Sequence, residues 1–293
     1  MLIYGTLKVM EMAKVLAALF LPGLPRVAHV PRKRGPLVES VLRRFTPGES
    51  ELGDCLRENG LWFEAQVLES SQLKDEAARF VSAGIVLSCA CPGYPARWRS
   101  ALGDSAPPAI WCSADFPSGA CYSVVGSRQV PLEGRKYSRE AGRAVARAGG
   151  VLVSGGASGC DSEAASGALS EGGSVVEILP YGFGAGRIEA IPGKCFLSVA
   201  PWNAGFSAAL AMERNALIYA ASERSLVAAV RFREGGTWNG AVQAMRRGLS
   251  QFFVRDVQAP GHQALINLGA HRVSSPDEFI LSELRLSPSL FAV

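Results

Sequence analysis

From residue 118 to residue 285 the sequence alternates short apolar runs with helix-like stretches, and this alternation limits the possible folds most strongly. Runs such as CYSVVGS, VLVSG and SVVEILP are continuously apolar, which is typical of strands buried on both faces. The stretches between them, such as GRKYSREAGRAVARAGG, have the length of helices and end in glycine pairs. This order predicts an α/β fold, with a Rossmann-like, doubly wound, mostly parallel sheet flanked by helices.

Residues 1–110 have a different composition, with five prolines between positions 22 and 47 and helix-like stretches such as PLVESVLRRF and SQLKDEAARFVSAG. A short strand, GIVLS, follows these stretches, and the segment SAPPAIWC then reads as part of an irregular bridge. We expect a small, mainly helical N-terminal region and bridge over residues 1–110. The Rossmann-like domain is expected over residues 118–285.

The composition excludes several classes of protein. With 48% hydrophobic and 19% charged residues the chain can form a sizeable core, and a net charge of +4 implies that any polyanion is bound by a local patch. Seven cysteines, an odd number, predict buried reduced thiols, and the pair Cys89 and Cys91 alone is a poor metal signal. No run approaches the roughly twenty apolar residues that a membrane span needs. We therefore expect a cytoplasmic protein with no metal, no cofactor and no membrane partner.

Three glycine-containing turns follow predicted strands, at the strand ends where doubly wound sheets bind ligands. Glycine lets an anion approach the backbone, and the first N–H groups of a following helix point towards it. Each turn alone is explained equally well as a tight turn, and Asp161 or Ser162 reads alternatively as a helix N-cap. Three such turns together predict a phosphate-binding site. Its predicted residues are Gly126, Ser127 and Arg128, then Ser154, Gly155, Gly156, Gly159 and Asp161, then Gly235, Gly236 and Thr237.

Four arginines, Arg135, Arg139, Arg143 and Arg147, recur every four residues and therefore form one stripe on the helix after the first turn. Evenly spaced cations suit a phosphate backbone and predict salt-dependent binding of a polyanion. The alternative is a solvated outer face that nearby glutamates partly neutralise.

No catalytic motif is present. The sequence contains no HExxH motif, no Walker-type loop and no readable Ser/His/Asp set, so we expect a protein that is not an enzyme.

Three aromatic residues, Tyr137, Trp202 and Trp238, are candidate platforms for stacked bases and equally good core residues.

The order VVGSR, SGGASGCD, ERN and GGTWNGA resembles the DNA-processing protein A (DprA/Smf) family over about residues 75–270. The resemblance implies a Rossmann-like, homodimeric, non-catalytic protein that binds single-stranded DNA. Such proteins aid DNA processing and recombination in natural transformation, with the recombinase RecA as a partner. The resemblance also adds Arg214 and Asn215 to the residues of the predicted pocket. We expect no C-terminal winged helix, because little of the given sequence follows residue 270.

The same superfamily includes the cytokinin-activating LOG enzymes, which leaves a second reading open. A nucleotide sensor or a LOG-like nucleotide phosphoribohydrolase would use the same glycine-turn pocket. The resemblance to those enzymes implies a catalytic glutamate in the helix that begins at the third turn. The matching helix of this chain offers Gln243 instead of a glutamate.

Overall fold

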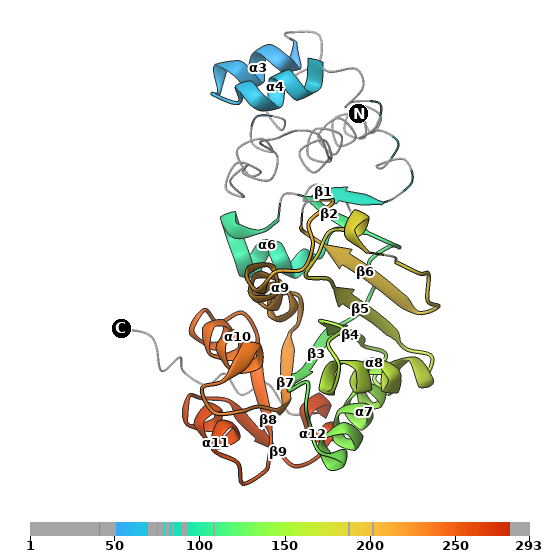
Figure 1. The fold of residues 1–293 in the computed structure, drawn as a ribbon, viewed down its shortest axis with the longest axis vertical. Helices are drawn as coiled ribbons and strands as arrows, with labels where there is room; N and C mark the ends of the chain where they lie inside the picture. Colours follow the sequence, from blue (N-terminus) through green and yellow to red (C-terminus); the bar gives the residue numbers. More distant parts are fainter. Residues whose placement is uncertain are drawn as a thin grey trace. The chain divides into compact units, whose positions relative to one another are not determined.

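A computed structural model describes residues 41, 51–69, 75, 79, 83, 85–88, 93–107, 109–186, 188–200 and 202–281 (Figure 1). Most of the predicted helices PLVESVLRRF and SQLKDEAARFVSAG lies outside these residues, as do Cys89 and Cys91.

Within the described residues nine strands form one mixed sheet in the order β1-β2-β6-β5-β4-β3-β7-β8-β9. The neighbours from β5 to β9 all pair in parallel, whereas β2 pairs antiparallel with both β1 and β6. The predicted doubly wound, mostly parallel sheet is therefore confirmed. The strands are β1 (Val86–Ser88), β2 (Ala109–Cys112), β3 (Cys121–Gly126), β4 (Val151–Ser154), β5 (Ser174–Ile178), β6 (Lys194–Ser198), β7 (Arg224–Ala229), β8 (Gln251–Arg255) and β9 (His271–Val273).

The chain forms two compact units, and the first comprises Met1–Phe116, Tyr181–Ile188 and Leu197–Gly205. Its described helices are α3 (Leu52–Glu58), α4 (Trp62–Glu69), α6 (Ala96–Leu102), η2 (Gly103–Ser105) and η3 (Phe183–Ala185). The segment SAPPAIWC was expected to be irregular, which is wrong for its last four residues. They form β2, which pairs with β1 and with residues 197–198 of β6.

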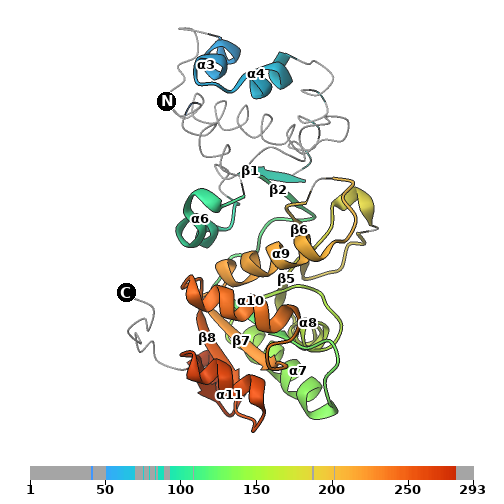
Figure 2. The ribbon, with the colours of Figure 1, turned by 60° about the vertical axis from the view of Figure 1, so that its left-hand side comes forward.

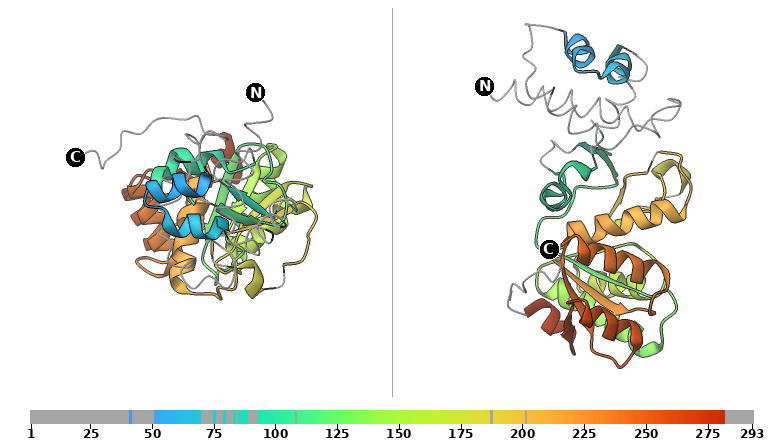
Figure 3. Two further views of the ribbon diagram at one scale, coloured as in Figure 1. Left: turned by 90° about the horizontal axis from the view of Figure 1, so that it is seen from above. Right: turned by 90° about the vertical axis from the view of Figure 1, so that its left-hand side faces the viewer.

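The second unit comprises Pro117–Pro180, Glu189–Phe196 and Phe206–Val293. Helices α7 (Leu132–Arg147), α8 (Cys160–Ser170) and α12 (Pro276–Leu281) lie on one face of its strands. Helices α9 (Ala208–Ala221), α10 (Gly235–Arg246) and α11 (Pro260–Asn267) lie on the other face (Figures 2 and 3). The predicted division between residues 110 and 118 stays a prediction, and two later segments, 181–188 and 197–205, group with the first unit.

Helices α7 and α8 approach each other backbone to backbone. A Cβ atom at Gly142 of α7 would clash with the carbonyl group of Ala164, and one at Gly167 of α8 would clash with the carbonyl group of Arg139. Glycine is required at both positions because any side chain would push the two helices apart.

The described residues contain no cluster of three or more His, Cys, Asp or Glu side chains placed to hold a metal ion. Five described cysteines carry thiols rather than disulfides, and all of them except Cys55 are buried. Among the described helices, none has the length and apolar character needed to cross a membrane.

Candidate ligand site at the switch point of the sheet

A cavity of about 540 Å³ lies within the second unit, beside the carboxyl ends of β3 and β7. From β3 the chain continues to β4 and β5 on one side, and from β7 it continues to β8 and β9 on the other. The connections therefore diverge between β3 and β7, which is where doubly wound sheets leave room for a ligand. The lining residues are Val125, Gly126, Ser127, Arg128, Gln129, Ala157, Asp161, Phe206, Ala208, Ala211, Met212, Arg214, Asn215, Ile218, Tyr219, Arg231, Glu234, Gly235, Gly236 and Thr237.

The turn after β3 places Arg128 in the cavity. The backbone N–H of Ser127 donates to the carbonyl oxygen of Ala229 at 2.9 Å, and its hydroxyl donates to the same oxygen at 3.4 Å. Both donors of Ser127 are thus directed to β7. The side chain of Arg128 is exposed and makes no ion pair or hydrogen bond with any described residue. Arg128 is therefore available to a ligand.

The turn after β4 differs from its prediction. Helix α8 begins at Cys160, and its N-cap is Gly159 at φ 88°, so neither Asp161 nor Ser162 is the cap. A Cβ atom at Gly159 would lie 2.5 Å from the carbonyl oxygens of both Ser127 and Arg128. Only glycine fits here, because the φ angle and the contact each exclude a side chain.

Asp161 accepts hydrogen bonds from the two glycine turns. Its carboxylate oxygens accept the backbone N–H groups of Gly126 at 3.3 Å and Gly155 at 3.2 Å. These donors were expected to face a bound phosphate, and here they bond to an anion that belongs to the chain. Ser154, Gly155, Gly156 and Gly159 do not line the cavity, and their role in ligand binding stays a prediction.

Asp161 and Arg214 are both only 6% exposed. Burial raises the pKa of Asp161 to about 6, and the positive charge of Arg214 and the N–H donors oppose this rise. Arg214 extends from α9 and its guanidinium donates to the carbonyl oxygens of Gly155 and Ile178, the latter at 3.0 Å. Burial lowers the pKa of Arg214, and Asp161 counteracts this. Arg214 thus connects α9 to the ends of β4 and β5.

The third turn opens α10. The N-cap residue Glu234 makes no capping hydrogen bond with its side chain, and the N–H groups of Gly235, Gly236 and Thr237 have no hydrogen-bond partner among the described residues. Asn215 of α9 donates to the carbonyl oxygen of Gly236 at 3.3 Å and so positions this turn. The positive end of the α10 dipole therefore opens on the cavity with unused donors.

The cavity also contains residues that the sequence did not indicate. Phe206 is 61% exposed although it lines the cavity wall. Arg231 donates to the side-chain oxygen of Gln129 at 3.0 Å and lies 3.8 Å from the carboxylate of Glu234. Arg231 could have been predicted from the sequence, because it lies just before the third glycine turn. The exposure of Phe206 had no local sequence signal.

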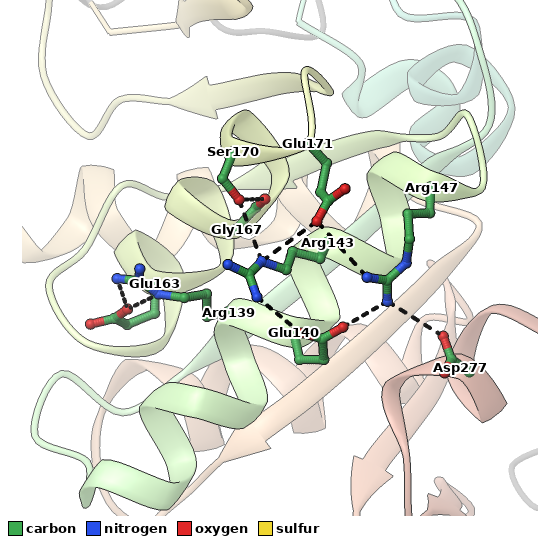
Figure 4. A network of polar contacts seen from close by, with 9 residues as sticks. All are labelled: Arg139, Glu140, Arg143, Arg147, Glu163, Gly167, Ser170, Glu171 and Asp277. Carbon is green, nitrogen blue, oxygen red and sulfur yellow. Dashed lines mark hydrogen bonds and ion pairs between the residues drawn. The ribbon is translucent and has the colours of Figure 1, made fainter.

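The arginine stripe lies outside the cavity lining, and Figure 4 shows its counter-charges on α7, α8 and α12. Ion pairs join Arg139 to Glu163 at 2.7 Å, Arg143 to Glu140 at 3.5 Å and to Glu171 at 3.7 Å, and Arg147 to Glu140 at 2.7 Å, to Asp277 at 3.8 Å and to Glu171 at 3.9 Å. Arg135 donates to the carbonyl oxygen of Val130 at 3.4 Å. These contacts match the alternative interpretation of the stripe, in which it is a solvated outer face partly neutralised by nearby glutamates. Contact of this stripe with a polyanion stays a prediction.

The three candidate stacking aromatics occupy different places. Tyr137 packs against the guanidinium of Arg255 at 4.7 Å, and Trp202 packs against Trp111 in the first unit. Trp238 lies in the first turn of α10, next to the cavity residue Thr237, with its ring centroid 5.3 Å from that of Phe232.

The mostly parallel sheet and the cavity at its switch point define a Rossmann-like α/β protein with a candidate ligand site, and the cation on the rim of that cavity, Arg128, has no partner among the described residues. The family described as DNA recombination-mediator protein A matches residues 86–284. The chain belongs to this family, as its sequence motifs had indicated.

Solved structures show the same fold. DNA processing protein A from Streptococcus pneumoniae is 21% identical and superposes with a TM-score of 0.68, covering 94% of this chain and 97% of its own. A structure from Helicobacter pylori, described by the single-stranded DNA binding mode of its DNA processing protein A, is 20% identical with a TM-score of 0.55. It covers 67% of this chain and 94% of its own. A comparison with curated proteins found no match.

Proposed function

We propose that this chain binds single-stranded DNA in the cavity between the turns after β3 and β7, without turning over a substrate. The observation that supports this most strongly is Arg128, an exposed cation with no partner among the described residues, on the rim of a cavity that also contains Arg231. A guanidinium is a planar set of donors that fits a phosphate group.

The cavity offers groups for each part of a nucleotide. Arg128, Arg231 and the open N–H groups at the start of α10 form a positive rim for a phosphate. Phe206 and Met212 present an apolar wall to a base, and a base stacks on an aromatic ring whatever its identity. Contacts of this kind give affinity without reading sequence. The binding mode for which the Helicobacter pylori protein is described supports the same ligand class.

The biological setting follows from family membership and the resemblance. We propose recombination as the process, with natural transformation as its context, a RecA-type recombinase as partner and a homodimer in the cytoplasm as the working form. The family description as a recombination mediator supports the partner. Co-purification with RecA and light scattering of the isolated chain test the partner and the dimer separately.

Titration with fluorescent oligo-dT at several salt concentrations tests the ligand. Each phosphate contact contributes a log–log salt slope of about −0.7 for single strands. Arg128→Ala combined with Arg231→Ala is expected to weaken binding by at least about tenfold and to reduce the slope by about 1.4, since two phosphate contacts are lost. Arg272→Ala is the matched control, because it removes an equally charged side chain that pairs with Asp256 outside the cavity and outside the arginine stripe.

Arg214 is unsuited to this test although the sequence placed it in the pocket. Its guanidinium holds buried carbonyl groups, so its removal would perturb the fold as well as the ligand. An unchanged affinity in the Arg128 and Arg231 double variant would overturn the proposed binding mode.

A mononucleotide is the second candidate ligand, and the cavity volume favours it specifically. About 540 Å³ lies within the range of sites for single small ligands. The residue in the place of the LOG glutamate, Gln243, is exposed and does not line the cavity. Stabilisation by a mononucleotide in a thermal-shift assay, with no affinity for oligo-dT, would favour a nucleotide sensor.

A further inference from the structure

The loop between β7 and α10 presents side chains to two different places. Arg231 and Glu234 line the cavity, whereas the two residues between them, Phe232 and Arg233, do not. Phe232 is 44% exposed, an unfavourable position for a large apolar ring in water. Adjacent Cα atoms lie about 3.8 Å apart, so the backbone of Phe232 is one residue step from that of Arg231, which lines the cavity.

The Phe232 ring has partners that hold it in place. Its centroid lies 5.3 Å from that of Trp238 in an edge-to-face arrangement with an interplanar angle of 74°. The guanidinium carbon of Arg233 lies 5.0 Å from the ring centroid. Two aromatic rings and a cation therefore form one cluster beside the cavity, the combination that single-stranded nucleic acid sites use for stacked bases.

The backbone under this cluster is closely packed. A Cβ atom at Gly261, in the first turn of α11, would lie 2.6 Å from the carbonyl oxygen of Val230 and 2.9 Å from the backbone nitrogen of Phe232. Arg233 adopts φ 59°, the one positive value at a non-glycine residue among those described. The loop thus keeps Phe232 at the surface on a firm support, and such preorganisation lowers the entropic cost of binding.

The other exposed large apolar side chains of the second unit lack this combination. Leu132, Ile191 and Leu281 are aliphatic, and Phe206 lies inside the cavity. Phe232 is the exposed aromatic that has both an aromatic partner and a cation in the described part of this unit.

We propose that Phe232, supported by Trp238 and Arg233, is a stacking platform for a second nucleobase of a DNA strand whose neighbouring nucleotide occupies the cavity. The inference rests on the proposed function and extends it, because it gives the strand a direction of exit across the β7–α10 loop. The connecting phosphate lies between Arg231 and Arg233, so charge and stacking act on the same nucleotide step.

The test compares a dT oligonucleotide long enough to span both places with thymidine monophosphate, which reaches the cavity alone. Phe232→Leu keeps an apolar side chain and removes the ring. It is expected to weaken oligonucleotide binding by about tenfold, the order of magnitude of one base–aromatic stack, and to leave thymidine monophosphate binding unchanged. Phe232→Tyr keeps the ring and is expected to bind the oligonucleotide as the wild type does.

Two controls separate the explanations. Ile191→Ala removes an exposed apolar side chain elsewhere in the same unit and is expected to change neither affinity. Fluorescence quenching by the oligonucleotide, lost in Trp238→Phe, reports a base beside the cluster. Wild-type affinity for the oligonucleotide in Phe232→Leu would overturn the platform and leave the proposed function standing. Equal weakening of both ligands would also overturn it, since Phe232 would then act through the cavity. If the wild-type chain binds no oligonucleotide, the proposed function itself fails.

Discussion

At the scale of single residues, Asp161 organises the candidate site. One buried carboxylate accepts N–H groups from the turns after β3 and β4, so it connects two loops that are 35 and 6 residues away in sequence. The anion that these glycine turns accommodate is thus supplied by the chain. Among the described residues that line the cavity, Arg128 and the start of α10 have donors without a protein partner, whereas Arg231 shares its guanidinium with Gln129 and Glu234.

Asp161→Ala is expected to lower the free energy of unfolding by about 2–5 kcal/mol. The substitution leaves two N–H groups without their acceptor and removes a negative charge beside the buried guanidinium of Arg214, and both effects are unfavourable. Urea unfolding followed by circular dichroism measures the change. Asp277→Ala is the control, since that carboxylate is 67% exposed and its ion pair is long, so a loss below about 0.5 kcal/mol is expected. Equal losses in the two variants would contradict the role of Asp161.

At the scale of elements, the sequence predicted those strands and helices whose formation depends on neighbouring residues in the chain. The continuous apolar run VLVSG indicated a buried strand, and β4 lies at Val151–Ser154. Strand β2 was missed because its evidence is the pairing of Trp111 with Ser198, far along the chain. The alternative reading of Asp161 as a helix N-cap was wrong for a similar reason, because its carboxylate oxygens accept from Gly126 and Gly155 instead. A stacking role for Phe232 could not be predicted from the sequence either, because the exposure of its side chain depends on how α10 and α11 pack.

The crossing of α7 and α8 gives a test at this scale. Gly142→Ala is expected to lower the free energy of unfolding by about 1–3 kcal/mol or more, because the new methyl group would clash with the backbone of Ala164 and neither helix can yield without moving. Chemical denaturation gives the value. Gly236→Ala is the matched control, as its nearest atom would lie 3.6 Å away and its φ is not positive. A stable Gly142→Ala variant would show that the helices separate more easily than their contact implies.

At the scale of the whole molecule, the distribution of charge matters more than its sum. The net charge of +4 indicated a local patch, and the evenly spaced row of arginines on α7 has paired acids on α7, α8 and α12 (Figure 4). The cavity arginine Arg128 has no such partner in the described part of the chain. Sequence spacing reveals where cations are dense, but only the fold reveals which of them remain available.

The pH dependence of stability is a property of the whole chain, and Asp161 gives it a defined sign. Its pKa is raised from 3.8 to about 6 on folding, so between these values the folded state binds a proton that the unfolded state has lost, and stability falls as the pH rises. His262 acts in the opposite sense: burial lowers its pKa below 6.5, so its contribution is lost as the pH falls through that value. The difference between wild type and Asp161→Ala cancels His262. The cost of the substitution is expected to be about 1 kcal/mol larger at pH 5 than at pH 7.5, measured by urea unfolding at both values. A cost that is constant or grows with pH would show that the folded state does not favour the protonated carboxyl.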